Sequence, residues 1–270
     1  MPKLAANLST LFAEFPMEDR PSAAADAGFE AVEMRFLDAE PDVRFLEDIK
    51  ARELEFVMFN ASPGNIAQGE LGLASLPQER ERFEKSIHRG IEWANRLGAS
   101  FLHVLAGKRS EHQTETQQRD AAIKAYAWAA EQAEKTGLTL LVEPMAPIAV
   151  ADYSIPSLES ALRIVREVNS AHFKVLFDFY HMQLAGGDII GRFTEARPWI
   201  GHVQIAAAPS RGEPDTGELN VDFVLGELDR AGYSGWVGCE YSPRTTTLAG
   251  LSWADKYLSK EALLKNSQTE

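Results

Sequence analysis

Several apolar runs of this sequence end on a side chain that carries oxygen. A buried strand whose only role is packing would be expected to end on an apolar residue instead. Four of them follow one another in the second half of the chain: Glu143, Asp178, Gln204 and Glu240. A buried carboxylate is costly without a compensating charge, so a group of acids needs a cation nearby. Three carboxylates and one amide suit a hard divalent cation. The four residues therefore predict a site for one Mg²⁺ or Mn²⁺ ion.

Two further polar residues lie in the loops that follow these runs. His181 comes three residues after Asp178 in the turn that leaves the run, which favours a contact with whatever the cation holds. Arg211 lies in a loop rich in turn-forming residues beyond Gln204. Its guanidinium group matches a carboxylate with two parallel hydrogen bonds, so Arg211 either binds an anionic substrate or fixes the loop through a salt bridge.

Other polar residues at run ends carry weaker indications. Glu33 and Asn60 either orient the ligands or bond to loop backbone. His103 favours a packing role, because the sequence shows no second histidine beside it. Cys239 precedes Glu240, so strand alternation directs it away from the site and towards the helices. The role of Lys108 stays open.

The elements that must position these residues form a repeated pattern of strands and helices. Four strands each follow a helix that stops at a glycine, a residue suited to the left-handed helix end, and they span 30–33, 100–103, 139–143 and 236–240. Four more apolar runs span 3–8, 54–60, 173–178 and 201–205. Helical apolar spacing separates them, as in 79–97, 116–135, 158–168 and 222–231.

Eight strands alternating with helices predict a parallel sheet closed into a single (β/α)8 barrel over residues 1–264, followed by a polar tail at 265–270. An open doubly wound sheet is the alternative. It is disfavoured because no Gly-x-Gly-x-x-Gly turn follows a strand and because the candidate residues come from many strands. In such barrels the active site lies at the carboxyl ends of the strands, where these polar residues stand.

Composition limits the partners of this barrel. The 270 residues carry a formal charge of −13, which disfavours nucleic acid and anionic membranes but leaves room for a small anionic substrate beside one or two local cations. The single cysteine excludes an internal disulfide and indicates a cytoplasmic protein. We expect no targeting segment, and no apolar run of this sequence is long enough for a membrane helix. A homo-oligomer is compatible with these features.

Short motifs distributed over nearly the whole chain resemble the hydroxypyruvate isomerase family, a branch of the xylose-isomerase-like barrels that is close to the 2-oxo-tetronate isomerases. The order and spacing of the motifs carry the resemblance: 5–9 (AANLS), 143–144 (EP), 178–183 (DFYHMQ), 201–205 (GHVQI), 211–214 (RGEP), 217–220 (GELN) and 235–241 (GWVGCEY). Gln204 departs from the histidine of the related ketose 3-epimerases and favours the isomerase branch. Met145-Ala146-Pro147 departs from the Ile-Asn expected after Glu-Pro and leans towards the 2-oxo-tetronate branch.

The resemblance implies roles for the candidate residues. Glu143, Asp178, Gln204 and Glu240 would bind the metal, Glu143 and Glu240 would also act as the acid–base pair, and His181 and Arg211 would contact substrate. The implied reaction converts hydroxypyruvate to tartronate semialdehyde through an enediolate. The alternatives are isomerisation of a 2-oxo-tetronate, 3-epimerisation of a ketose, a barrel that binds a sugar acid without turnover, and a metal-dependent nuclease. Six histidines and the acidic charge argue against the nuclease.

Overall fold

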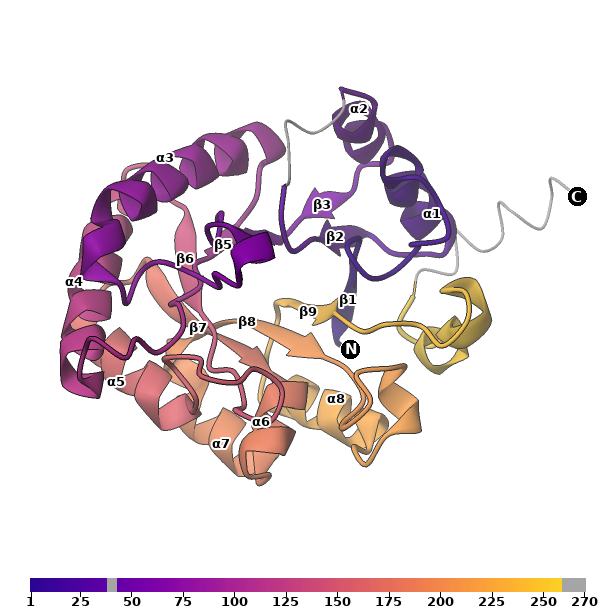
Figure 1. Cartoon of the computed structure of the whole chain (residues 1–270). Coiled ribbons are helices and arrows are strands. Elements are labelled where there is room, and N and C mark those ends of the chain that lie inside the picture. The colour runs from indigo at the N-terminus through magenta and orange to yellow at the C-terminus, as the bar shows by residue number, and fades with distance from the viewer. Residues whose placement is uncertain (38–42, 259–270) are drawn as a thin grey trace, which may run out of the picture. The chain divides into compact units, whose positions relative to one another are not determined.

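The computed structural model describes residues 1–37 and 43–258, which fall into two units. The first unit contains Met1–Val57 together with the chain from Val203 onward, and the second contains Met58–His202. Each unit consists of parallel strands that alternate with helices, labelled in Figure 1. The predicted single domain over 1–264 stays a prediction, and the predicted tail at 265–270 lies outside the described residues.

The first unit is built on five strands in the order β3-β2-β1-β9-β8, all parallel. Their bounds are β1 Lys3–Asn7, β2 Ala31–Glu33, β3 Glu55–Phe56, β8 Ile200–Ile205, which begins in the second unit, and β9 Trp236–Cys239. Its α-helices are α1 Arg20–Asp26, α2 Val43–Ala51 and α8 Val221–Arg230, and the 3₁₀ helix η6 spans Leu248–Ala254. The register sets Asn7 beside Glu33 and Gln204 beside Gly238.

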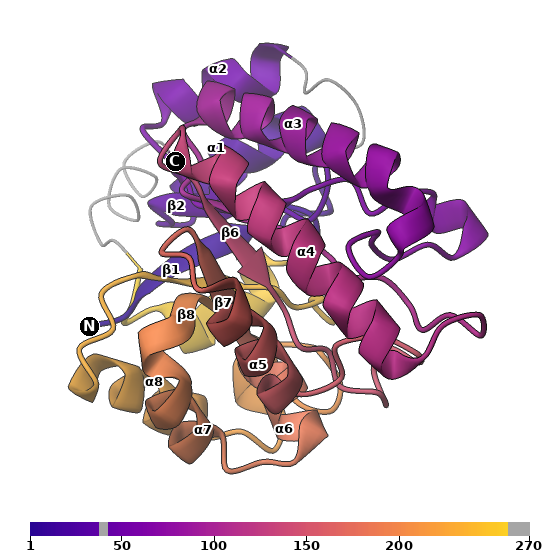
Figure 2. The same ribbon diagram turned by 90° about the vertical axis from the view of Figure 1, so that its left-hand side faces the viewer.

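The second unit contains four parallel strands in the order β7-β6-β5-β4. Their bounds are β4 Met58–Asn60, β5 Phe101–His103, β6 Thr139–Val142 and β7 Phe173–Asp178. The helices are α3 Arg80–Leu97, α4 Glu115–Glu134, α5 Leu158–Val168, α6 Phe179–Ala185 and α7 Ile189–Ala196. Helices α3, α4 and α5 lie side by side and cover β5, β6 and β7 (Figures 1 and 2).

Local sequence explains where these helices begin and end. Helix α4 starts with a capping box in which Thr114 and Gln117 satisfy each other's backbone N–H groups. Helix α3 stops at Gly98, whose φ of 66° is the left-handed conformation that favours glycine. Along α5, Leu158, Leu162 and Val165 lie buried on one side, as an amphipathic helix on a sheet requires. No helix in the described part of the chain is long and apolar enough to cross a membrane.

One predicted strand differs from the observed structure. The run at 54–60 forms two short strands, β3 and β4, interrupted at Val57. The reason is a change of pairing partner, since β3 pairs with β2 whereas β4 pairs with β5. The N–H group of Val57 donates to the Val32 carbonyl over 2.8 Å. The nine strands in the described residues thus correspond to the eight that the sequence predicts.

Candidate active site

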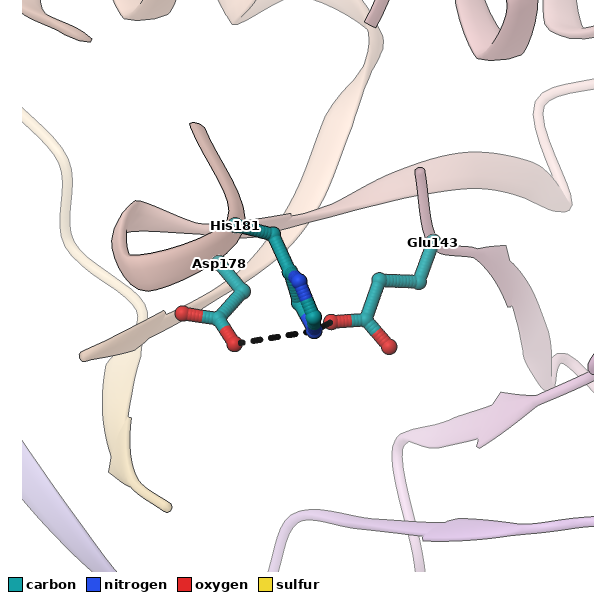
Figure 3. A group of neighbouring side chains, drawn as sticks. All are labelled: Glu143, Asp178 and His181. Carbon is teal, nitrogen blue, oxygen red and sulfur yellow. Dashed lines mark ion pairs between the residues drawn. The ribbon is translucent and has the colours of Figure 1, made fainter. Parts of the chain in front are cut away.

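Two buried carboxylates and an imidazole meet in the second unit (Figure 3). Glu143 follows the end of β6, Asp178 is the last residue of β7, and His181 lies in the first turn of α6. The His181 Nε2 atom is 3.7 Å from Glu143 Oε1 and 3.9 Å from Asp178 Oδ2. All three side chains are at most 5% exposed, so two negative charges lie out of water with a neighbour that can offer at most one positive charge. Such a group favours a bound cation.

The two oxygens of Asp178 have different surroundings. The Tyr180 N–H group donates to Oδ1 over 2.9 Å, because Asp178 caps the first turn of α6. The other oxygen, Oδ2, is the one that faces His181. The helix start therefore fixes the rotamer of Asp178 and presents one oxygen to the site.

A backbone hydrogen bond sets the tautomer of His181. The Ala146 N–H group donates to Nδ1 over 3.3 Å, so Nδ1 accepts and the proton of the neutral ring is on Nε2. The Nε2–H group then points at the carboxylates of Glu143 and Asp178. A metal bond at Nε2 would require the proton to move to Nδ1. The Nδ1–H group would then face the Ala146 N–H group, and two donors cannot form a hydrogen bond. The geometry thus favours His181 as a hydrogen-bond donor, in keeping with its predicted substrate contact, although its position would also suit a ligand.

His103 lies on the other side of Glu143. Its Nε2 atom is 3.8 Å from Glu143 Oε2, and its Nδ1 atom is 3.1 Å from the side-chain oxygen of Asn60. The sequence favoured packing for His103, since no second histidine stands near it along the chain. The fold supplies that neighbour, because His103 and His181 each approach one oxygen of the same glutamate.

In the first unit, Glu33 holds two side-chain amides. Its Oε1 atom accepts from Asn7 Nδ2 over 3.0 Å and from Gln204 Nε2 over 2.6 Å, and all three side chains are buried. The direction of Asn7 follows from its own oxygen, which accepts from the Ser9 N–H group over 3.1 Å. A carboxylate only accepts, so Gln204 must direct its NH₂ group at Glu33.

This arrangement determines what Gln204 can offer. Its Oε1 atom is buried and has no hydrogen-bond partner among the described residues. An unsatisfied buried acceptor costs free energy, and a cation would satisfy it. An amide oxygen of this kind is a good ligand for Mg²⁺ or Mn²⁺. Gln204 therefore fits its predicted role as a metal ligand, and Glu33 orients it.

Glu240, which follows β9, contacts two arginines in the same unit. Arg35 Nε donates to Glu240 Oε1, and Arg211 Nη2 lies 3.2 Å from Glu240 Oε2. The sequence prediction included Arg211 and missed Arg35. The signal for Arg35 was its spacing, because strand alternation puts residue 35 on the same face as Glu33 if the chain stays extended beyond β2.

The loop that carries Arg211 is held firmly. Arg211 has a left-handed backbone, with φ of 56°, and its N–H group donates to the Ala207 carbonyl over 2.7 Å. Two residues on, buried Glu213 accepts from the Arg244 N–H group over 2.9 Å and from Arg244 Nε over 3.1 Å. Burial raises the pKa of Glu213, but these hydrogen bonds and the Arg244 charge outweigh it and lower the pKa below its ordinary value.

Other groups near the acids are kept neutral. Burial, reinforced by the charge of Glu143, raises the pKa of the Tyr153 hydroxyl. Burial and the charge of Glu33 likewise raise the pKa of the Cys239 thiol, which suits its predicted packing role.

Lys108, whose role the sequence left open, is exposed. Its backbone forms an isolated antiparallel β-bridge with Tyr153.

The four predicted ligands fall into two pairs, one in each unit. Glu143 and Asp178 belong to the second unit and lie close together, whereas Gln204 and Glu240 belong to the first. Their joint binding of one cation stays a prediction.

Comparison with known proteins places these residues in context. Residues 21–257 match the model of the xylose isomerase-like TIM barrel family. The chain is 39% identical to 2-oxo-tetronate isomerase of Cupriavidus necator, over 96% of this chain and 100% of that protein. It is 35% identical to hydroxypyruvate isomerase of Escherichia coli, over 95% and 100%. The crystal structure of AP endonuclease, family 2 from Brucella melitensis superposes with a TM-score of 0.93 at 36% identity, over 96% of this chain and 100% of that one. The predicted barrel fold is confirmed.

Proposed function

Because this chain belongs to the xylose isomerase-like TIM barrel family, and matches isomerases over almost its whole length, we propose that it is a cation-dependent isomerase of a small sugar acid. The observation that carries the proposal is the pair of buried carboxylates, Glu143 and Asp178, beside the Nε2–H group of His181. Buried acids next to a directed proton donor suit proton transfer at a substrate carbon.

We propose Glu143, Asp178, Gln204 and Glu240 as the ligands of one Mg²⁺ or Mn²⁺ ion. Buried carboxylate oxygens and the oriented amide oxygen of Gln204 support the choice of a hard cation. When bound, such a cation supplies electrostatic stabilisation of negative charge that develops on substrate oxygens.

The residues of the chain account for the remaining chemistry. Conversion of hydroxypyruvate to tartronate semialdehyde moves the carbonyl from C2 to C3, so one proton must leave C3 and one must return to C2, while the hydroxyl proton passes from O3 to O2. Glu143 and Glu240 share these two transfers, each contributing on the order of 10²- to 10⁴-fold. His181 donates its Nε2 proton in a hydrogen bond to a substrate oxygen, and Arg211 binds the substrate carboxylate.

Hydroxypyruvate is the first substrate candidate, and a 2-oxo-tetronate is the second. The second is favoured by the relative at 39% identity that bears this name and by Met145-Ala146-Pro147 after Glu143-Pro144. Both are short 2-oxo acids with a hydroxyl on the neighbouring carbon, so the same proton transfers serve both.

Three alternatives are less well supported. A DNA-repair nuclease would agree with the name of the Brucella melitensis structure. It would need several metal sites rich in histidine and a basic face, whereas the described residues contain one candidate cluster with one histidine and the chain carries a charge of −13. A ketose 3-epimerase shares the enediolate chemistry, but Gln204 departs from its predicted pattern. A barrel that binds the acid without converting it would lack turnover altogether.

One experiment separates these activities. Metal-stripped protein is incubated with and without Mg²⁺ or Mn²⁺ in the presence of hydroxypyruvate, a 2-oxo-tetronate, a neutral ketose or a DNA duplex with an abasic site, and products are identified by NMR or gel electrophoresis. We expect cation-dependent isomerisation of one of the two acids. Cleavage of the duplex without isomerisation, or equal isomerisation after exhaustive chelation, would reject the proposal.

A further inference from the structure

We infer that Arg35 and Arg211 together form a carboxylate-binding site that selects acids over neutral ketoses of the same chain length. The inference rests on the proposed function for its substrate class and extends it by a residue, Arg35, that the motifs do not include. The geometry that supports it is the contact of both guanidinium groups with Glu240.

The two arginines approach Glu240 from different elements and take different oxygens. Arg35 lies just beyond β2 and donates to Oε1, while Arg211 lies in the loop after β8 and contacts Oε2 over 3.2 Å. Their backbones are fixed near these positions. The Arg35 N–H group donates to Ser9 Oγ over 2.9 Å, and the Arg211 carbonyl accepts from the Ser242 N–H group over 2.8 Å. The pair is therefore a built feature of the first unit.

The three side chains differ in their access to solvent. The Glu240 side chain is 10% exposed and that of Arg211 is 22% exposed, so their contact is largely shielded from water. Arg35 is 41% exposed, which leaves its guanidinium group accessible to an anionic ligand.

The role proposed for Glu240 requires its contacts with the two arginines to change. A Glu240 that binds a cation or transfers a proton must turn at least one oxygen from a guanidinium group to that task. If Arg35 loses Glu240, it can bind a substrate carboxylate instead, because the two oxygens of that group match its planar donors. A neutral ketose offers no such replacement. The pair thus favours substrates that bring their own carboxylate.

A matched pair of substrates tests this selection. Hydroxypyruvate and dihydroxyacetone differ only in that a carboxylate replaces a CH₂OH group, and both can isomerise through an enediol. We expect Arg35→Met to raise the KM for hydroxypyruvate about tenfold or more, the loss typical of a charged hydrogen bond, with a smaller change in kcat. The efficiency with dihydroxyacetone should fall much less, so that the ratio of the two efficiencies drops about tenfold.

Two further variants guard against a purely structural effect. Arg35→Lys keeps the charge but not the planar donors, so it should recover part of the loss. Arg52→Met removes another arginine of the same unit, one that pairs with Asp26 and does not contact Glu240, and it should leave both substrates unaffected. Circular dichroism of each variant checks the fold. An unchanged ratio of efficiencies for the two substrates in Arg35→Met would overturn the inference.

A binding measurement keeps the inference testable without turnover. Calorimetric titration with D-glycerate and with glycerol compares an acid with a neutral molecule of the same chain length. Both lack the ketone carbonyl and so cannot isomerise. We expect wild-type protein to prefer D-glycerate and Arg35→Met to bind it about tenfold more weakly. If neither hydroxypyruvate nor a 2-oxo-tetronate is isomerised, but the preference for D-glycerate is present and depends on Arg35, the inference stands and the proposed function fails. If wild-type protein and Arg35→Met bind D-glycerate equally, or neither binds it, the inference fails whatever the catalytic result.

Discussion

The side-chain amide of Gln204 donates to Glu33 Oε1 over 2.6 Å, although the two residues are 171 positions apart in sequence. Their strands, β8 and β2, are separated in the sheet by β9 and β1. Glu33 reaches across because Gly238 of β9 has no side chain: a Cβ atom there would lie 2.4 Å from Glu33 Oε2. The orientation of one candidate ligand thus depends on two residues that would not touch the cation.

We predict that Glu33→Gln weakens Mn²⁺ binding by about 10- to 100-fold, the range typical of residues that orient metal ligands. A glutamine at this position can donate as well as accept, so the amide of Gln204 is no longer held in one direction. Binding is measured by electron paramagnetic resonance of free Mn²⁺ during titration. The exposed Glu30→Gln on the same segment is the control. Equal Mn²⁺ affinities of Glu33→Gln and wild-type protein would show that Glu33 does not act on the cation site.

We predict that Gly238→Ala lowers the free energy of unfolding by roughly 1–3 kcal/mol, the usual cost of overpacking a core. The added methyl group meets the Glu33 carboxylate, which is itself held by Asn7 and Gln204 and has little freedom to move. Urea denaturation gives the change. Gly226→Ala in helix α8 is the matched control, because its nearest neighbour would be 3.6 Å away and alanine favours a helix. Similar effects of both substitutions would contradict the proposed close approach.

We predict that Glu143→Gln and Glu240→Gln each lower kcat by on the order of 10²- to 10⁴-fold, because the amide cannot take up a proton. The amide keeps an oxygen that can bind a cation, so metal content is measured on the same samples. A variant that keeps its metal and loses turnover identifies an acid–base residue. A variant with normal metal content and near-normal kcat would limit that glutamate to a ligand role.

We predict that Glu213 makes the fold sensitive to acid. Its folded-state pKa is lowered, so its contribution to stability is present above the unfolded carboxyl value of about 4.3 and is lost as pH falls through the folded value. Glu213→Gln should therefore be less stable than wild-type protein at neutral pH, with the difference shrinking as the pH falls below the unfolded value and through the folded one. Thermal unfolding at a series of pH values gives the comparison. A constant difference across the series would show that the charge of Glu213 is not involved.

Much of the fold follows from local sequence. The apolar run that ends at Asp178 and the helix stop at Gly98 lie where the sequence predicted them, because a buried strand and a left-handed helix end each have a local signature. The interruption at Val57 could not be predicted, since it arises from a change of pairing partner rather than from the residues of the run.

The candidate site was predictable to a lesser extent. Polar residues at strand ends indicated Glu143 and Asp178, and the structure brings these two together. The tautomer of His181 depends on a backbone N–H group 35 residues away, and the contact between Arg35 and Glu240 spans 205 residues. Contacts of this kind depend on the order of strands in the sheet and the conformation of loops. Spacing within the sequence can indicate the strand face on which Arg35 lies, but it encodes neither the strand order nor the loop conformation.

The close approach of the Glu33 carboxylate to Gly238 has a consequence for the divergence of this family. A substitution there is disfavoured on its own, since the first methyl group meets the Glu33 carboxylate. Positions 33, 204 and 238 should therefore covary among homologues: lineages that replace the glycine should also have shortened or replaced the glutamate and found another way to orient the residue at 204. The glycine on β9 thus makes the substitutions accepted at three positions, far apart in the sequence, depend on one another during evolution.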